Sequence, residues 1–501
     1  MSRKIVASKS VNFLMMISLT SKALGFLRDI VLTYFWGANS VSDAFIIAIT
    51  VPGTVCDLLI QAIAVGFIPT YTEIVAHRTK KDGDFFTISF IELLLVCCLP
   101  IICFMGFRPD LIIKIFASGF NEETNNIAAL FIRITASSIL FKMIVSVLAG
   151  YLQSNKQYVV PAFIGIPYDI VIIIGIVLSY YVNKNILPFS VIVAGFVQAI
   201  VLMTASARKG LNFRVTSKII TDDTKSVLQL LLPLLIIVGA NQINVIIDRT
   251  FASYVQTGAI TILDYANKIC LMIENIVVFS IVAILYPELG KDSATKDEGA
   301  FASHLKDASS KIIRYLVPTS VYIMMLAYPI VAVLFGRGAF SDSNVNDTAQ
   351  CMMFYSIGIV FVALRTIYTR ALYAIKKVRS VTIISIITLF INALLNAFFV
   401  KLLGLRGLAL ATSIANIVTT IAMFCVLYKN NRGIRLTTSK SLMLAIVSSV
   451  AQFVFVLALS NVFFRHDGSK FHYVIGLTIQ GIILGTSVLV SDKLAKQGKR
   501  N

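Results

Sequence analysis

The chain consists of long apolar stretches separated by short polar breaks from one end to the other. An apolar run of about 20 residues is long enough to cross a bilayer as an α-helix. Hydropathy and the turn residues between the runs divide the chain into a series of fourteen predicted spans. They cover residues 11–36, 42–75, 85–106, 125–151, 158–181, 186–206, 226–253, 260–288, 312–335, 347–373, 380–400, 406–428, 441–464 and 472–491. The predicted fold class is an all-α polytopic membrane protein without a soluble domain.

Composition and charge sharpen this prediction. A chain of 501 residues that is 57% hydrophobic and 14% charged could not bury its apolar surface in water. Of its 44 Lys and Arg residues, 27 fall on the segments of one side of the predicted membrane and 7 on the opposite loops. This asymmetry follows the positive-inside rule and predicts both termini in the cytoplasm. The net charge of +19 is then mainly a topology signal that can also contact anionic lipids, and no nucleic acid partner is expected.

The charge pattern at the start of the chain occurs twice. Arg28 and Asp43 are fifteen residues apart, and Arg249 and Asp264 repeat that spacing in the second half of the chain. The two arginines and the two aspartates are therefore related by one common offset. Two landmarks at one offset indicate that the chain contains a duplicated unit.

A third landmark supports the repeat. The stretch "AGYLQSNKQYVVPAF" resembles "RALYAIKKVRSVTII". This resemblance pairs Tyr151 with Tyr373, which are 222 positions apart, whereas the paired charges are 221 positions apart. We therefore predict a six-helix lobe at 1–225, a second six-helix lobe at 226–430, and two further helices with a basic cytoplasmic tail at 431–501. Parallel repeats of this kind place a substrate site between the halves and move by rocking one half against the other. Such an architecture is typical of a transporter.

The first helix carries charges at depths where a membrane helix should be apolar. At about 100° per residue, Lys22, Gly25, Arg28 and Asp29 fall within an arc of about 120° and share one face. A charge near the bilayer centre costs at least about 2.5 kcal/mol, so such residues usually have a partner or a function. One interpretation pairs Arg28 with Asp29 or Asp43 to hold two helices together. The other places these charges around an internal cavity.

Two lysines favour the cavity interpretation. Lys22 has no obvious local partner, which suggests a cationic cavity wall. Lys268 is the comparable cation of the second half, although it could also extend to a membrane interface. Two such cations suit an anionic substrate, such as a phosphate or a diphosphate.

A second polar group contains Asp248, Asn392, Asn396 and Thr412. The two asparagines are four residues apart and share a helix face. Acid, amide and hydroxyl oxygens are the ligands that a hard cation prefers. Asn and Thr also form ordinary polar contacts between membrane helices, and the pattern alone favours that structural role.

The sequence contains no motif that indicates catalysis. Asp82-Gly83-Asp84 in "HRTKKDGDFF" superficially resembles the D-x-D motif of metal-dependent glycosyltransferases, but it has no domain around it, which favours a solvated turn. The four His residues are scattered, and the seven Cys residues show no C-x-x-C spacing. We expect a protein that is not an enzyme and binds no soluble cofactor.

Three stretches resemble one known family. "SKALGFLRDIVLTYFWGANSVSDAF" resembles the N-terminal signature of the MurJ/MviN lipid II flippases, in the multidrug/oligosaccharidyl-lipid/polysaccharide exporter superfamily. "GRGAFSDSNVNDTAQCMMFYSIGIVFVALRTIYTRALYAIKKVRS" and "GLRGLALATSIANIV" resemble the C-terminal half of that family. The resemblance implies a bacterial inner-membrane protein whose cavity binds the diphosphate-sugar head of an undecaprenyl-linked precursor and moves it by alternating access. It also implies a set of substrate-binding residues, namely Lys22, Arg28, Asp43 and Lys268.

The chain departs from the family at several of these positions. The family usually has Arg where this chain has Lys22 and Lys268, and Lys keeps the charge but loses the bidentate phosphate fork. A further cavity Arg is expected after the proline of the second helix, where "PGTVCD" has Cys56 and Asp57 instead.

The resemblance also implies a sodium site, with Na⁺ as a coupling ion. The site maps onto the side chains of Asp248, Asn392, Asn396 and Thr412 and the carbonyl of Leu408, and an Asp is expected where Asn396 stands. The last two helices of the family form a groove for the lipid tail, and both corresponding segments are apolar here.

Together these observations predict a flippase that moves lipid II from the inner to the outer leaflet. A flippase for another lipid-linked oligosaccharide, such as an O-antigen, capsule or exopolysaccharide unit, is an alternative because of the lost arginine. A non-transporting membrane scaffold is a further alternative. We expect a monomer that contacts membrane lipids and works with cell-wall synthesis proteins.

Overall fold

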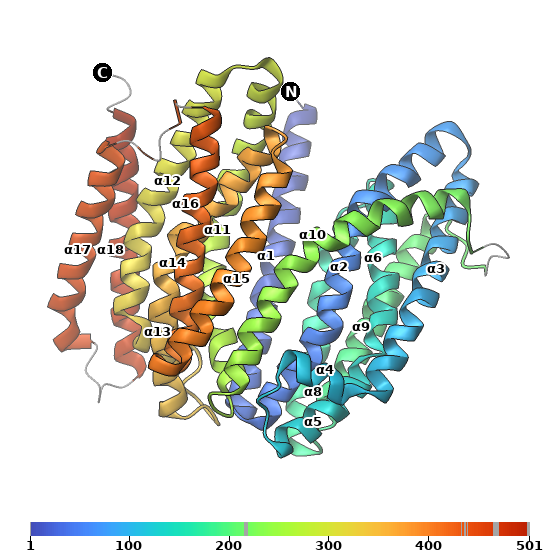
Figure 1. Ribbon diagram of the computed structural model, residues 1–501, viewed down its shortest axis with the longest axis horizontal. Coiled ribbons are helices and arrows are strands. Elements are labelled where there is room, and N and C mark those ends of the chain that lie inside the picture. The colour runs from blue at the N-terminus through green and yellow to red at the C-terminus, as the bar shows by residue number, and fades with distance from the viewer. Residues whose placement is uncertain are drawn as a thin grey trace. The chain divides into compact units, whose positions relative to one another are not determined.

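The computed structural model describes residues 2–214, 219–431, 433–434, 437, 439–463 and 470–497. Within these residues all regular secondary structure is α-helical, as Figure 1 shows, so the predicted all-α class is confirmed. The chain divides into two compact units, which we call unit 1 (Met1–Gly258) and unit 2 (Ala259–Asn501).

Unit 1 contains the first ten helices. They are α1 (Ser2–Trp36), α2 (Ser40–His77), α3 (Lys80–Phe107), α4 (Pro109–Phe116), α5 (Glu122–Thr135), α6 (Ser138–Ser154), α7 (Val159–Phe163), α8 (Gly165–Tyr181), α9 (Ile186–Arg208) and α10 (Asp222–Ser253). Helix α2 packs against α5, α6 and α10, while α1 lies along α8. The seam between α1 and α8 carries the charged residues of the first helix.

Unit 2 contains the remaining eight helices. They are α11 (Ala259–Thr295), α12 (Glu298–Met325), α13 (Ala327–Leu334), α14 (Asp342–Ala374), α15 (Val378–Leu403), α16 (Leu405–Asn430), α17 (Ser439–Phe463) and α18 (Lys470–Gln497). Helix α14 packs against α11, α12 and α16, and it is the most buried of the eight. Helices α17 and α18 pack against each other and against α12 (Figure 1).

The break between the first two helices shows how local sequence sets these boundaries. Gly37 has a φ of 65°, a conformation that most residues avoid and that commonly ends a helix. The Asn39 side chain then accepts hydrogen bonds from the backbone N–H groups of Val41 and Ser42 and caps α2. The sequence "WGANS" therefore ends one helix and starts the next within three residues.

The number of membrane spans differs from the prediction. Ten helices of the described chain are long and apolar enough to cross a membrane, and two bent pairs raise that number to twelve. Helices α5 and α6 meet at 44°, and α12 and α13 meet at 74°. The predicted spans 11–36 and 226–253 form α1 and α10, which are not among these twelve. Charges reduce the apolar character of α1, and the middle side chains of α10 lie outside the described set. The predicted count of fourteen is not confirmed.

The compact units and the predicted repeat divide the chain at different places. The repeat predicts a boundary at residues 225 and 226, which assigns α10 to the second lobe. By packing, α10 belongs to unit 1, because it contacts α2, α3 and α4. The lobe boundaries concern the duplication rather than the packing, and they stay a prediction.

Backbone conformation supports the repeat and corrects one of its landmarks. Gly37 and Gly258 both have positive φ, 65° and 86°, and they are related by the same offset as the repeated charges. Lys156 and Lys376 both have a φ of 60°, and in each case the N–H of the next residue donates to the carbonyl five positions earlier at 2.8 Å. Lys156 and Lys376 therefore end equivalent helices in the two halves of the chain. The sequence alignment that paired Tyr151 with Tyr373 places Lys156 opposite Val378 instead, and it is wrong by two positions. Side-chain similarity suggested that alignment, but backbone conformation fixes the turn.

Candidate functional site

One arginine of the first helix is held by two carboxylates. The Arg28 Nη1 donates to Asp169 Oδ1 at 2.9 Å, and Nη2 and Nε donate to Asp29 Oδ1 at 3.1 and 3.3 Å. The side chain of Arg28 is 21% exposed and those of both acids are 9% exposed. Of the two pairings considered from the sequence, the one with Asp29 is confirmed. The second carboxylate comes from α8, which the sequence did not predict.

Small residues bring α1 and α8 into close contact around this cluster. A Cβ placed on Gly25 would lie 3.3 Å from Asp169 Oδ2, and a Cβ on Gly165 would overlap the hydroxyl of Ser21. At the far end of the seam, the indole N–H of Trp36 donates to Ser179 Oγ at 3.1 Å. The ion pair therefore lies in the middle of a tightly packed helix–helix seam.

Asp43 has a different partner from the one expected. It is 1% exposed, and its Oδ2 accepts a hydrogen bond from the backbone N–H of Gly258 at 2.7 Å. Asp43 lies in the first turn of α2, where a negative charge also interacts favourably with the helix dipole. This predicted site residue thus binds the loop that follows α10.

Lys22 is exposed on α1 and, within the described residues, forms no hydrogen bond or ion pair. It lies on the same helix as Arg28, whose charge is already balanced by two acids. Lys22 is thus the cation of this face that is available to an external anion. The role of Lys22 in binding an anionic substrate stays a prediction. Its ammonium group is exposed and could contact such a substrate.

Lys142, which the sequence analysis did not select, brings a further cation close to Gly53 of α2. A Cβ on Gly53 would lie 4.0 Å from Lys142 Nζ, and this ammonium acts electrostatically on Cys56 and Asp57. The resembled family is expected to have an Arg after the proline of the second helix. Here that part of α2 has Asp57, and the nearby cation is Lys142 of α6.

In unit 2, the predicted cation Lys268 has an acidic partner. Its Nζ lies 2.7 Å from Asp264 Oδ2, one turn earlier on α11, and 5.4 Å from the centre of the Tyr265 ring. The counterpart of Arg28 in the repeat, Arg249, instead donates to the carbonyl of Ile46 and the hydroxyl of Thr50 on α2. The repeated charges thus have different partners in their two copies.

The residues of the predicted sodium site do not all lie in one unit. Asn396 donates to Asn392 Oδ1 at 3.1 Å, and both residues are buried in α15. The Thr412 hydroxyl donates to the Leu408 carbonyl at 3.0 Å on the neighbouring α16. Asp248, the carboxylate of the set, belongs to unit 1. In unit 2, the side-chain N–H₂ of Asn392 is buried without a hydrogen-bond partner, so this polar group is not fully satisfied by the protein.

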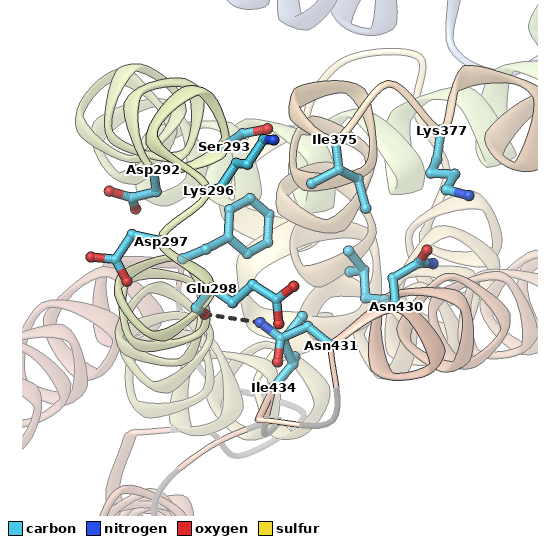
Figure 2. Close-up of a pocket in the computed structure, with 12 residues that line it drawn as sticks. Asp292, Ser293, Lys296, Asp297, Glu298, Ile375, Lys377, Asn430, Asn431 and Ile434 are labelled. Atoms are coloured by element: carbon cyan, nitrogen blue, oxygen red, sulfur yellow. Dashed lines mark hydrogen bonds between the residues drawn. The ribbon is translucent and has the colours of Figure 1, made fainter.

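A separate cavity of about 300 Å³ lies at the polar end of unit 2 (Figure 2). The Glu298 side chain projects into it, whereas the carboxylates of Asp292 and Asp297 point away. Phe301 lines the cavity and follows the N-cap of α12 by four residues. The same position after the N-cap of α3 is Gly83, where a Cβ would lie 2.7 Å from Val75. The glycine allows α3 to lie against α2.

The D-x-D stretch has a structural role. The carboxylate of Asp82 accepts hydrogen bonds from the backbone N–H and the hydroxyl of Thr79, at 3.0 and 2.7 Å. This is a capping box at the start of α3. The expected solvated turn is thus wrong: the stretch lies in the first turns of α3, and Gly83 within it is buried.

Comparison with known proteins gives a consistent result. The family model described as lipid II flippase MurJ matches residues 32–478. A probable lipid II flippase MurJ of Rickettsia prowazekii is 25% identical over 94% of this chain and 92% of its own length. Another, of Thermotoga maritima, is 25% identical over 79% of this chain and 80% of its own length.

Solved structures show the same fold. The structure of a lipid II flippase MurJ in an inward closed conformation is similar with a TM-score of 0.82 and 24% identity, covering 97% of this chain and 99% of that one. An inward-facing multidrug resistance MATE family transporter of the MOP superfamily has a TM-score of 0.72 and 14% identity, over 84% of this chain and 97% of that one.

Proposed function

The chain belongs to the lipid II flippase MurJ family, and on this premise we propose that it moves lipid II from the inner to the outer leaflet of the bacterial cytoplasmic membrane by alternating access. It is a multi-pass protein of that membrane, and the distribution of Lys and Arg supports cytoplasmic termini. No covalent step is needed, because moving a lipid between leaflets requires only binding and a change of conformation.

The observation that carries this proposal is the free ammonium group of Lys22 on α1, within the predicted span 11–36. A cation in that environment is maintained against a considerable solvation cost, which favours a functional role. The diphosphate of lipid II is an anion of matching chemistry. Lys142 adds a second cation in unit 1, close to Gly53 of α2. The resembled family usually has arginines at the position of Lys22 and after the proline of the second helix. In this chain Lys22 and Lys142 supply the positive charge in these two places.

The remaining predicted site residues have distinct proposed roles. Arg28 and Lys268 contact the diphosphate at a stage of the cycle in which they leave their carboxylate partners. Asp43 acts indirectly, because it holds the backbone of Gly258. We expect one chain to be sufficient for transport, working beside the proteins that make and polymerise lipid II.

We also propose a Na⁺ ion as the coupling ion. Amide, hydroxyl and carbonyl oxygens are available in unit 2 from Asn392, Asn396, Thr412 and Leu408, and Asp248 would supply a carboxylate. Only the side-chain oxygen of Asn392 could bind the ion, because its N–H₂ group is a hydrogen-bond donor. When bound, Na⁺ would link transport to the sodium gradient. Replacing Na⁺ by choline should slow transport by the wild-type protein and leave the rate of Asn392→Ala unchanged.

The test of the proposed function is complementation of a bacterium depleted of its own lipid II flippase. The wild-type chain should restore growth, and Lys22→Ala should not, although it should reach the membrane at the same level. Lys22→Arg keeps the positive charge and should restore growth. Lysis despite normal expression of the wild-type chain would point to a different lipid-linked oligosaccharide, in keeping with the acid that Asp57 adds. Growth with Lys22→Ala would contradict the role of the lysine.

A further inference from the structure

The Arg28 cluster contains one positive and two negative groups, and this balance limits what it can bind. The guanidinium donates through Nε, Nη1 and Nη2, and each of these nitrogens donates to a carboxylate oxygen. Recognition of a diphosphate by arginine uses the same fork of N–H groups. These bonds engage three of the five N–H groups of the guanidinium, and the two carboxylates balance its charge, so an anionic lipid competes with both acids for Arg28.

The two acids differ in how they can be released. Asp29 is the next residue on α1 and moves with Arg28, so a movement of the helix does not separate them. Asp169 belongs to α8, 141 positions along the chain, and its contact depends on the seam between the two helices. Release of the guanidinium thus means release of Asp169.

The seam is built so that this contact and the helix packing change together. Asp169 Oδ2 lies where a side chain on Gly25 would be in contact with it, and Ser21 and Gly165 bring the helices close on one side of the ion pair. The hydrogen bond from Trp36 to Ser179 closes the seam on the other side. The ion pair cannot open widely while both flanking contacts persist, since close packing resists small local adjustments.

We propose that Asp169 is a positioning residue that holds Arg28 when no substrate is bound and is displaced by the diphosphate of the substrate, so that substrate binding loosens α1 from α8. This inference rests on the proposed function. Asp169 then has two effects on transport. It weakens binding, because the state with a free Arg28 is only partly populated. It also speeds release, because it takes Arg28 back at the end of the cycle.

The test measures binding and transport separately. Purified wild type, Asp169→Asn and Asp169→Glu are compared for their affinity for undecaprenyl diphosphate and for lipid II transport in proteoliposomes. For Asp169→Asn we expect a Kd lower by about tenfold together with a lower maximal rate, since the competing state is lost. Asp169→Glu keeps the charge and should stay close to the wild-type Kd. Asp110→Asn, which removes an exposed acid of α4, is the matched control and should change neither quantity.

A second measurement needs no substitution. The chain has a single tryptophan, Trp36, and its indole is bonded to α8. Its emission in the wild-type protein should shift when undecaprenyl diphosphate is added and should not shift with undecaprenol, which lacks the anionic group. Unchanged emission would overturn the proposal, and so would an unchanged or higher Kd in Asp169→Asn. Failure of the wild type to bind undecaprenyl diphosphate or transport lipid II would instead overturn the proposed function, and this inference with it.

Discussion

The carboxylate of Asp43 accepts the backbone N–H of Gly258 at 2.7 Å, which ties the start of α2 to the loop after α10, 215 residues away. The carboxylate is almost completely buried, and the loop residue has a φ of 86°. A charged acceptor makes a stronger hydrogen bond than a neutral one. Charge within the membrane part of this chain thus has a structural use as well as the proposed functional one.

Replacement of Asp43 should reveal the strength of that bond. Asp43→Ala should lower the free energy of unfolding by about 1.5–3 kcal/mol, the range for hydrogen bonds to charged groups, because the N–H loses its acceptor. Asp43→Asn keeps a side-chain oxygen and should lose less. Thermal unfolding of the purified variants in one detergent gives the comparison. Equal unfolding temperatures for Asp43→Ala and the wild type would show that water replaces the carboxylate.

Gly258 should tolerate no side chain. A Cβ at this position would lie 2.5 Å from the carbonyl oxygen of Ala38, and the positive φ is itself unfavourable for other residues. Gly258→Ala should therefore cost about 1–3 kcal/mol of stability.

The matched control for that substitution is Gly481→Ala in α18, where a Cβ would meet no atom within 4 Å. Alanine favours a helix more than glycine does, so this variant should be neutral or slightly more stable. Thermal unfolding of both variants provides the measurement. Similar unfolding temperatures for the two would contradict the steric argument at Gly258.

Lys142 should contribute to transport because its positive charge balances the carboxylate of Asp57. Lys142→Met removes the cation close to Gly53 of α2 and should reduce lipid II transport about tenfold, equivalent to about 1.4 kcal/mol of activation free energy. If the cost arises from leaving Asp57 without its cation, Asp57→Asn should restore part of the activity in the double variant. A double-mutant cycle in proteoliposomes measures this coupling. Strictly additive effects would show that the two residues act independently.

The sequence made some of these features predictable because they depend on local pattern. Apolar runs predicted the helices, and the spacing of Arg28 and Asp43 with their counterparts predicted the duplication. The pair of Arg28 with Asp29 was within reach because the two residues are adjacent. Capping of α3 by Asp82 follows a short-range rule of the same kind.

Other features depend on contacts that no local pattern encodes. Asp169 and Lys142 are lone charges in the apolar stretches "PYDIVIII" and "LFKMIV", and that isolation is the signal that could have selected them. Their partners lie on other helices, so the sequence gives no direct means of pairing them. The span count differed at α1 and α10, because charges lower the apolar character of α1 and the middle side chains of α10 lie outside the described residues. The partner of Asp43 is a backbone N–H group. Every residue except proline has such a group, so the side-chain sequence does not identify this partner.

The polar end of unit 2 should respond to pH through His304. This residue precedes the apolar part of α12, and its Nδ1 lies 2.7 Å from Asp292 Oδ2 in the segment after the predicted span of α11. The hydrogen bond to Asp292 is the main reason that the pKa of His304 is raised above its ordinary value of 6.5. A raised pKa in the folded state means that the pair stabilises the protein below about pH 6.5 and that this contribution is lost as the pH rises through the folded pKa.

Titration by NMR of protein labelled at its histidines should therefore give a pKa above 6.5 for His304. Asp292→Asn should lower that pKa, because the neutral amide no longer favours the charged ring. The wild-type unfolding temperature should fall between pH 6 and pH 8 by more than that of Asp292→Asn. The His304 side chain is 38% exposed, so solvent screening keeps the difference small. An unchanged titration of His304 in Asp292→Asn would show that the carboxylate does not hold the proton on this ring.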